Sequence, residues 1–441
     1  MKMLQQLTTR CLNQLTRHFP DQSDFLIGLS GGVDSVVLLD LFAQLRENRT
    51  LNLRAIHIHH GLSSNADSWV AFCEKLCERY AIPLTVQKVK VEGKQGLEAN
   101  ARQARYQAIQ SHIRANEVLV TAHHQDDQVE TFLLALKRGS GIKGLGAMQA
   151  VSFLQKIPIF RPLLAISKQE ILAYAQQRKL VWIEDESNQR DDFDRNFLRN
   201  QVLPLLNQRW AQFNPMVARA SRHCAEQQLL IEELLAEELA TRFNPQDGSL
   251  SITHFAQCSP LKQQQLIRLW LQHLQVEMPS QAQLAQILDN LIFSEQDKNP
   301  QVKLGDKEIR RYQERIFVVS AVEQVTPFEM ILPPQMDVKF SLPNEIGTII
   351  RTADSIICKK SDKIDRLLLP KELRDKPLTL KLNHSGKVKC YGKPHREEIK
   401  KIWQKNSVPV WQRTRTPLVF FDEQFVGLIN TSLSQERSCQ P

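Results

Sequence analysis

The first part of the chain alternates short apolar runs with segments of helical periodicity. Apolar residues three and four positions apart predict helices at Val33–Glu47, Ala66–Tyr80 and Leu97–Asn116. Alternation of strands and helices at this length predicts an α/β fold, a parallel sheet with helices on both faces, whose ligands bind at the carboxyl ends of the strands. The strands, each flanked by turns, are predicted at Asp24–Leu29, Leu53–His59, Leu84–Val91 and Glu117–His123.

The remainder of the chain has a different pattern. A Pro-marked stretch, Thr326–Pro334, suggests a junction between domains. We therefore predict three domains: a catalytic domain at 1–215, a mainly helical middle domain at 216–325 and a small basic α+β domain at 326–441. Within the last two we expect helices Glu226–Leu239, Pro260–Leu274, Gln281–Leu291 and Pro394–Asn406, and strands Val302–Leu304, Glu308–Tyr312 and Arg315–Val319.

Composition supports a soluble protein of several domains. The chain has 441 residues, of which 42% are hydrophobic and 24% charged. No apolar run approaches the ~20 residues that span a bilayer, so we expect no membrane partner and a cytoplasmic location. The eight cysteines include no C-x-x-C pair. This argues against a disulfide framework and against a zinc or iron–sulfur site.

The most informative motif is the loop Leu29-Ser30-Gly31-Gly32-Val33-Asp34-Ser35 between the first strand and its helix. Gly31 and Gly32 let the backbone turn sharply and approach an anion, and the N–H groups of the following helix face the phosphates of a ligand. Ser30 and Ser35 can donate hydroxyl hydrogen bonds, and Asp34 can hold Mg²⁺. No lysine ends the loop, so it is not the nucleoside-triphosphate loop G-x-x-x-x-G-K-[ST]. A tight strand–helix turn without a ligand is the alternative.

Acidic residues follow the fourth predicted strand. Asp126, Asp127 and Glu130 lie in the first turn of the next helix, where the helix dipole favours negative charge. Asp127 and Glu130 share a face and can bind either magnesium or an ammonium group. An exposed acidic helix start without a ligand is the other interpretation.

Basic residues are concentrated near the C-terminus. The segment Lys371–Arg415 holds thirteen Lys or Arg against four acidic residues, whereas the whole chain has a net charge of +9. Such a field attracts polyanions, and the interleaved Tyr391, Trp403 and Trp411 suit stacking on bases. A solvated lysine-rich face is the alternative, and helical spacing allows Trp403 to be a core residue.

The S-G-G-x-D-S loop resembles that of the ATP-pyrophosphatase family, whose fold is adenine nucleotide alpha hydrolase-like. Within that group the chain is similar to tRNA(Ile)-lysidine synthetases over about residues 24–215. The motifs that carry the likeness are Thr121–Thr131, Lys137–Leu145, Leu97–Arg102 with Arg105 and Tyr106, Arg161–Leu164, Glu184–Asn188 and Arg195–Arg199.

The resemblance implies a C–N ligase that uses ATP and Mg²⁺. Such an enzyme adenylates O2 of the wobble cytidine of a CAU-anticodon isoleucine tRNA, and L-lysine then displaces AMP to give lysidine. It implies that Ser30, Gly31, Gly32, Val33, Asp34 and Ser35 bind ATP, with Asp34 on the metal, and that Asp34, Asp127 and Glu130 are catalytic. Asp127 and Glu130 are expected to bind lysine. The expected tRNA contacts are Arg195, Arg199, Lys393, Arg396, Lys400, Lys401, Arg413 and Arg415.

Other residues have open roles. Arg102, Arg105, Lys137 and Arg138 suit phosphates of ATP or RNA as well as ordinary surface positions. The family usually continues its second strand as H-G-L-R, whereas this chain has His60-Gly61-Leu62-Ser63, and His60 is a candidate for the adenosine end of the site. His57, His59, His123 and His124 are expected to be packed or capping residues.

Three other functions stay open. A tRNA 2-thiolation enzyme shares the activation chemistry but usually needs paired cysteines. An amidating ligase usually brings a glutaminase domain with a cysteine nucleophile, which Met1-Lys2-Met3 does not offer. A non-enzymatic RNA-binding protein would not need the phosphate loop. The sequence leaves open the oligomeric state, a homodimer included, the adenine contacts and the rejection of methionine tRNAs.

Overall fold

A computed structural model describes residues 2–61, 63, 65–92, 97–186, 191–294, 300–320, 325–334, 339–360, 363–429 and 436–437. The chain forms two compact units, Met1–Ile231 and Glu232–Pro441. This division into two units does not test the three predicted domains. Their boundaries at 215 and 325 therefore remain predictions. Among the helices of the described ranges, none is long and apolar enough to cross a membrane.

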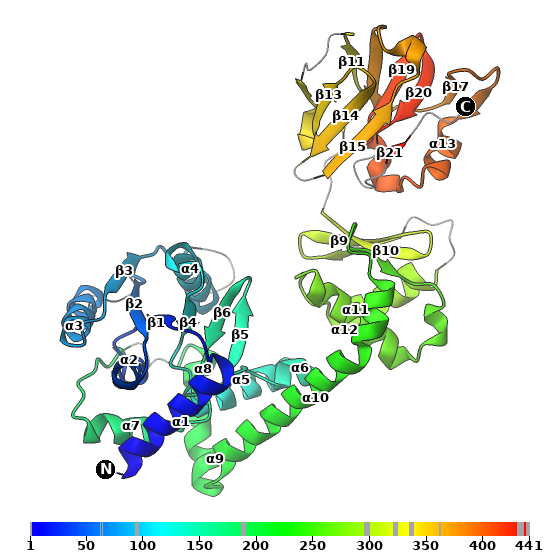
Figure 1. Cartoon of the computed structure of the whole chain (residues 1–441). Coiled ribbons are helices and arrows are strands. Elements are labelled where there is room, and N and C mark those ends of the chain that lie inside the picture. The colour runs from blue at the N-terminus through cyan, green and yellow to red at the C-terminus, as the bar shows by residue number, and fades with distance from the viewer. Residues whose placement is uncertain are drawn as a thin grey trace. The chain divides into compact units, whose positions relative to one another are not determined.

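The first unit is built on a mainly parallel sheet with the strand order β3-β2-β1-β4-β6-β5 (Figure 1). Every neighbouring pair is parallel except the edge hairpin β5–β6. The chain moves outward from β1 to β2 and β3, and then returns to place β4 on the other side of β1. Strand order therefore reverses between β1 and β4, and ligands of such sheets bind outside the strand ends at that point. The strands are β1 Asp24–Gly28, β2 Asn52–His59, β3 Leu84–Lys88, β4 Val118–Val120, β5 Val151–Leu154 and β6 Ile157–Phe160.

Helices cover both faces of this sheet, as predicted. On one face, Phe25 and Ile27 of β1 share a core with residues of α1, α2, α3 and α7. On the other face, Leu26 packs with Ile109 of α4. Alternate residues of one strand thus enter different cores, as the pleat requires. The helices of the unit are α1 Lys2–His18, α2 Val33–Asn48, α3 Ala66–Arg79, α4 Leu97–His112, α5 Gln125–Lys137, α6 Ile142–Leu145, α7 Lys168–Gln177, α8 Asp194–Phe197, the π-helix η2 Leu198–Val202, α9 Leu203–Arg209 and α10 Phe213–Arg242, which continues into the second unit.

A buried carboxylate ties α2 to α7. Asp40 of α2 is fully buried and accepts hydrogen bonds from the hydroxyls of Tyr80 (2.7 Å) and Tyr174 (2.6 Å) and from the guanidinium of Arg178 (2.9 and 3.1 Å). Burial alone would raise the pKa of Asp40, but these donors lower it below its ordinary value. The contact fixes α7, which begins at the cavity described below.

The second unit begins with a sheet of order β7-β10-β9-β8 packed against helices. Its core includes Trp270, Leu271 and Ile309, all fully buried. The three strands predicted here are confirmed to within one residue at each end. The elements are β7 Leu250–Ser251, the 3₁₀-helix η3 Phe255–Gln257, α11 Pro260–His273, α12 Gln281–Gln286, the π-helix η4 Ile287–Ile292, β8 Gln301–Leu304, β9 Lys307–Tyr312 and β10 Arg315–Ser320.

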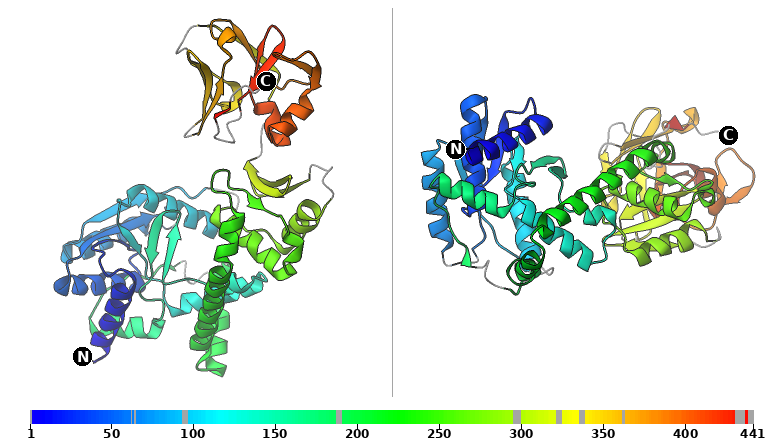
Figure 2. Two further views of the ribbon diagram at one scale, coloured as in Figure 1. Left: turned by 45° about the vertical axis from the view of Figure 1, so that its right-hand side comes forward. Right: turned by 90° about the horizontal axis from the view of Figure 1, so that it is seen from below.

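The C-terminal part of this unit packs two sheets face to face (Figure 2), with orders β11-β16-β19-β20-β17-β18 and β12-β13-β14-β15-β21. Ile349 and Ile356 of one sheet share a core with Leu380 and Val419 of the other. The elements are β11 Phe328–Leu332, β12 Lys339–Ser341, η5 Pro343–Glu345, β13 Thr348–Arg351, β14 Ser355–Lys360, β15 Lys363–Leu368, η6 Lys371–Leu373, β16 Leu378–Leu382, β17 Lys387–Cys390, β18 Arg396–Glu398, α13 Ile399–Lys405, η7 Val410–Arg415, β19 Leu418–Phe421, β20 Gln424–Leu428 and β21 Glu436–Arg437.

The boundaries of several predicted elements were wrong. The basic helix Pro394–Asn406 is shorter, because Arg396–Glu398 pairs with β17 as a strand and the helix occupies only Ile399–Lys405. The strand predicted at Glu117–His123 is confined to Val118–Val120, and His124, which lines the cavity described below, follows four residues later.

Replacing Asp40 with asparagine should destabilise the protein by about 3 kcal/mol, because two hydroxyls and a guanidinium lose their anionic acceptor. Thermal unfolding followed by circular dichroism measures the effect. The exposed Asp21→Asn is the matched control, and equal unfolding temperatures for the two variants would contradict the anchoring role of Asp40.

Candidate active site

The loop after β1 is shaped by glycine and by one buried hydroxyl. Gly31 has φ of 90°, and a Cβ there would lie 2.8 Å from Cδ1 of Ile183, so a side chain does not fit. Ser35 Oγ accepts from the N–H groups of Ser30 (3.2 Å) and Gly31 (3.1 Å) and donates to Gly32 O (2.9 Å). Ser35 therefore holds the loop in shape, while Ser30 is exposed. Gly32, the N-cap of α2, gives the first helical N–H groups no side-chain acceptor, which leaves them available to an anion.

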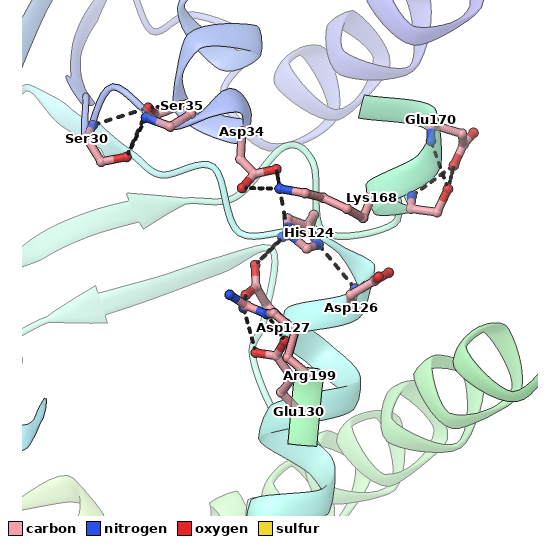
Figure 3. A network of polar contacts seen from close by, with 12 residues as sticks. Ser30, Asp34, Ser35, His124, Asp126, Asp127, Glu130, Lys168, Glu170 and Arg199 are labelled. Carbon is pink, nitrogen blue, oxygen red and sulfur yellow. Dashed lines mark hydrogen bonds and ion pairs between the residues drawn. The ribbon is translucent and has the colours of Figure 1, made fainter. Parts of the chain in front are cut away.

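Asp34 lies in the first turn of α2 and is paired with a lysine from a distant segment (Figure 3). Lys168 Nζ, 134 residues later, donates to both carboxylate oxygens of Asp34 at 2.7 and 2.8 Å. Nε2 of His124 lies 3.6 Å from the same carboxylate. The magnesium ligand predicted from the sequence thus already has a cation beside it.

The acidic helix start after β4 is organised by His124. Its side chain is the N-cap of α5, where Nδ1 accepts from the Asp126 N–H at 3.2 Å. Asp127 completes the capping box by accepting from the His124 N–H at 2.9 Å. Since Nδ1 is the acceptor, the Nε2 proton faces the carboxylates of Asp34 and Asp127, at 3.6 and 3.5 Å. One histidine therefore links the two helix starts.

Two arginines neutralise the buried acidic pair. Arg199 donates to Glu130 at 2.7 and 3.0 Å and to Asp127 at 3.4 Å, and Arg195 lies 3.5 Å from Glu130. Glu130 is fully buried, and burial raises its pKa above the ordinary value although Arg199 opposes the shift. Burial would also raise the pKa of Asp127, but His124, His123 and Arg199 bring it below the ordinary value. The pKa values of these two neighbouring carboxyls are thus shifted in opposite directions.

Some of these groups line a cavity of about 370 Å³ beside the start of α5. Its wall includes polar side chains from four separate segments of the first unit. Glu130 lines the cavity, whereas Asp127 is not among the lining residues and acts mainly as a cap. The lining residues are His124, Asp126, Glu130, Lys168, Arg199, Leu203, Pro204, Asn207 and Asn214. Cationic, anionic and amide groups around one cavity suit a substrate that carries both phosphate and amine.

Comparisons with known proteins agree with this geometry. Residues 3–206 match the PP-loop domain, residues 250–317 the TilS substrate binding domain and residues 378–441 the TilS substrate C-terminal domain. The tRNA(Ile)-lysidine synthase of Actinobacillus pleuropneumoniae is 57% identical over 94% of this chain and 97% of its own length. That of Haemophilus ducreyi is 53% identical over 98% of this chain and 100% of its own.

This chain belongs to the tRNA(Ile)-lysidine synthase family. The predicted resemblance is therefore confirmed, as is the predicted fold class of the first domain. A solved structure, the U34-tRNA thiolase NcsA of Methanococcus maripaludis, is 17% identical with a TM-score of 0.42, over 51% of this chain and 79% of that chain. No cysteine is among the described residues that line the cavity. The alternative of a tRNA 2-thiolation enzyme therefore gains no support.

Other residues singled out in the sequence have ordinary partners. Lys137 pairs with Asp194 at 2.7 Å, and the Arg102 guanidinium lies 5.2 Å from the Tyr106 ring centre. His57 contacts Leu29 O at 2.9 Å, and His59 contacts Asp67 at 3.2 Å. Leu62, Ser187 and Asn188 of the family-like motifs lie outside the described residues.

The predicted tRNA contacts of the C-terminal region separate into two groups. Lys393, Arg396, Lys400 and Lys401 are exposed. Arg413 and Arg415 instead donate to backbone carbonyls, those of Val408 (3.3 Å) and Asn344 (2.5 Å). The expected aromatic stacking is wrong for Trp411, which is buried, and Trp403 is a core residue, the alternative that its helical spacing allowed.

Sequence reasoning missed Lys168, Asn207 and Asn214. The signal for Lys168 was present, because Ser167 and Glu170 form an S-x-x-E capping box that places Lys168 at the first position of a helix. Nothing in the sequence indicated that this helix begins beside Asp34.

His60 should make stability depend on pH. Its Nδ1 is buried without a hydrogen-bond partner among the described residues, and burial, with smaller effects of Arg105, His57 and His59, lowers its pKa from 6.5 to about 4. The unfolded chain binds a proton near pH 6.5 but the folded chain only near pH 4, so stability falls as the pH drops through this window.

Consequently His60→Asn should lose less stability than the unsubstituted protein between pH 7 and pH 5. Urea unfolding at both pH values tests this, with the exposed His395→Asn as control. Parallel losses in all three proteins would show that His60 does not titrate in this way.

Proposed function

We propose that this chain joins L-lysine to the wobble cytidine of a CAU-anticodon isoleucine tRNA, at the expense of ATP. The observation that carries the proposal is a cavity lined by the acidic start of α5 and by Lys168, whose ammonium group pairs with Asp34 of the phosphate loop. Family membership supports the same reaction. Transfer of labelled lysine to such a tRNA, dependent on ATP, is the test, and transfer without ATP would contradict it.

In the first step, O2 of the cytidine attacks the α-phosphorus of ATP. The O2–Pα bond forms, the bond from Pα to its bridging oxygen breaks, and pyrophosphate leaves with the electron pair. At the end of the loop of Ser30 to Ser35, the first N–H groups of α2, which have no side-chain cap, would hold the outer phosphates. This activation converts a poor leaving group, the carbonyl oxygen, into AMP.

The residues present fit a magnesium ion that ATP itself helps to hold. Asp34 offers one partly exposed carboxylate, and the part of the chain that the structure describes has no cluster of three or more metal-binding side chains. Mg²⁺ commonly takes one or two carboxylates and completes its octahedron with phosphate oxygens and water. When bound, the ion would neutralise charge on the phosphates.

In the second step, the ε-amine of lysine attacks C2 of the adenylated base and expels AMP. The amine must lose a proton, and two carboxylates, Asp126 and Glu130, line the cavity. Glu130, whose pKa is raised, is the one that we propose accepts it. Asp127 would support Glu130 indirectly, because it accepts hydrogen bonds from Arg199 and from the His124 N–H at the start of α5. Arg195 and Arg199, predicted as tRNA contacts, have partners in this acidic pair, so their contact with tRNA stays a prediction.

We propose that the exposed cations of the C-terminal region bind the tRNA body. Lys393, Arg396, Lys400 and Lys401 lie on or beside β18 and α13, so they can contact phosphates together. A homodimer and cytoplasmic location remain parts of the proposal.

Asp34→Ala should reduce ATP-dependent lysine incorporation by about 10³-fold while leaving tRNA affinity within about twofold, because it removes the metal ligand but no exposed cation. Filter binding and labelled lysine transfer measure the two quantities. The exposed Asp21→Ala is the control. Full activity in Asp34→Ala would remove this carboxylate from the mechanism.

Reversing two charges, Lys400→Glu with Lys401→Glu, should weaken tRNA binding by at least tenfold and lower the slope of log affinity against log salt by about 1 to 2. The control Lys359→Glu with Lys360→Glu changes the net charge equally on exposed strand residues. If both pairs have the same effect, only net charge matters and the surface at α13 is not a docking site.

A further inference from the structure

The phosphate loop has no lysine, yet the fold brings one to it. Lys168 Nζ lies 2.7 and 2.8 Å from the two oxygens of Asp34, the residue at the start of α2 (Figure 3). Its side chain is 34% exposed and lines the cavity. In nucleoside-triphosphate loops of the G-x-x-x-x-G-K-[ST] type, a lysine within the loop reaches the outer phosphates. Here an ammonium group reaches the phosphate loop from another helix, α7.

The backbone that carries Lys168 is fixed on all sides. Ser167 and Glu170 cap the start of α7 reciprocally, with Ser167 N–H donating to Glu170 at 2.9 Å. Arg10 of α1 donates to the same glutamate at 2.6 Å. One helix turn after Glu170, the hydroxyl of Tyr174 donates a hydrogen bond to the buried Asp40. The ammonium group is therefore held near the loop by a rigid helix start and a flexible side chain.

Charge balance indicates what this ammonium does. The cations that line the cavity are Lys168 and Arg199, and Arg199 makes two hydrogen bonds to the buried Glu130. Removing Arg199 from Glu130 would leave the buried carboxylate with only the longer, 3.5 Å contact to Arg195, and loss of a partner from a buried ion pair costs several kcal/mol. Lys168 binds a partly exposed carboxylate, so it can exchange partners at lower cost. A metal ion held by Asp34 would compete with the ammonium for this carboxylate, and the accompanying triphosphate would offer the ammonium phosphate oxygens as new acceptors.

We propose that Lys168 is a catalytic residue of the adenylation step, which rests on the function proposed above. With the nucleotide bound, Nζ moves from Asp34 to the oxygens of the outer phosphates. As the bond between Pα and the bridging oxygen breaks, pyrophosphate takes the electron pair, and the ammonium donates hydrogen bonds to the growing charge without transferring a proton. Preorganised cations of this kind act most strongly where charge develops.

A simpler role predicts opposite effects. If Lys168 only neutralises Asp34 in the empty site, it competes with the metal and the nucleotide. Its removal would then tighten binding of magnesium pyrophosphate and leave the rate of adenylation unchanged. The two roles therefore predict opposite changes in the affinity for magnesium pyrophosphate. They also predict different rates of adenylation.

The experiment compares full-length protein with Lys168→Met, Lys168→Arg and the control Lys179→Met, an exposed lysine that follows the other end of α7. Calorimetry gives dissociation constants for magnesium pyrophosphate, Mg·ATP and AMP. Single-turnover formation of AMP with saturating tRNA(Ile) transcript and lysine gives the rate. Thermal unfolding verifies that each variant is folded, and Lys168→Gln replaces Lys168→Met should the latter not fold.

We expect Lys168→Met to slow AMP formation by about 10²- to 10³-fold. It should weaken magnesium pyrophosphate and Mg·ATP by at least fivefold and change AMP affinity by less than twofold. Lys168→Arg should recover part of the rate, and Lys179→Met should match the unsubstituted protein. An unchanged rate, or tighter binding of magnesium pyrophosphate in Lys168→Met, overturns the proposal. If the unsubstituted protein forms no AMP at all, the proposed function fails, whereas the pyrophosphate constants still decide the role of Lys168.

Discussion

The chemistry of this protein depends on two helices that begin next to each other. Helix α2 follows β1 and helix α5 follows β4, and these strands are hydrogen-bonded neighbours at the point where strand order reverses. Both helix starts direct N–H groups and positive partial charge at one region, so anions are stabilised there. Asp34 and Asp127 occupy those first turns, and His124 lies between them. The cavity is therefore built for negative charge before any substrate enters.

Such a site needs cations, and the fold supplies them from remote parts of the first unit. Lys168 balances Asp34, and Arg199 balances Glu130 and Asp127. The two pairs differ in burial, because Glu130 is fully buried whereas Asp34 and Lys168 are both partly exposed. A buried pair resists separation, while a partly exposed pair exchanges partners more readily. We therefore expect the Lys168–Asp34 pair to rearrange when phosphate binds. The Arg199–Glu130 pair would stay in place, where a substrate amine can approach a carboxylate.

Much of this site could be predicted from the sequence, because its parts are local. The Gly-Gly turn, Asp34 and the acidic start of α5 each follow a predicted strand, and parallel strands bring their carboxyl ends to one edge. What the sequence could not show are contacts between distant segments: Lys168 with Asp34 across 134 residues, and Arg199 with Glu130 across 69. Trp403 and Trp411 are a related case, since exposure cannot be read from a basic stretch that also contains core positions. The ends of some strands were also wrong, as at Glu117–His123, of which only the apolar Val118–Val120 form a strand.

We propose that this site directs attack at the α-phosphorus of ATP. This proposal is tested most directly by identifying the nucleotide formed from α-labelled ATP in the presence of lysine and the CAU-anticodon isoleucine tRNA. We expect AMP and pyrophosphate in amounts equal to the lysine incorporated. Formation of ADP and orthophosphate in their place would contradict it.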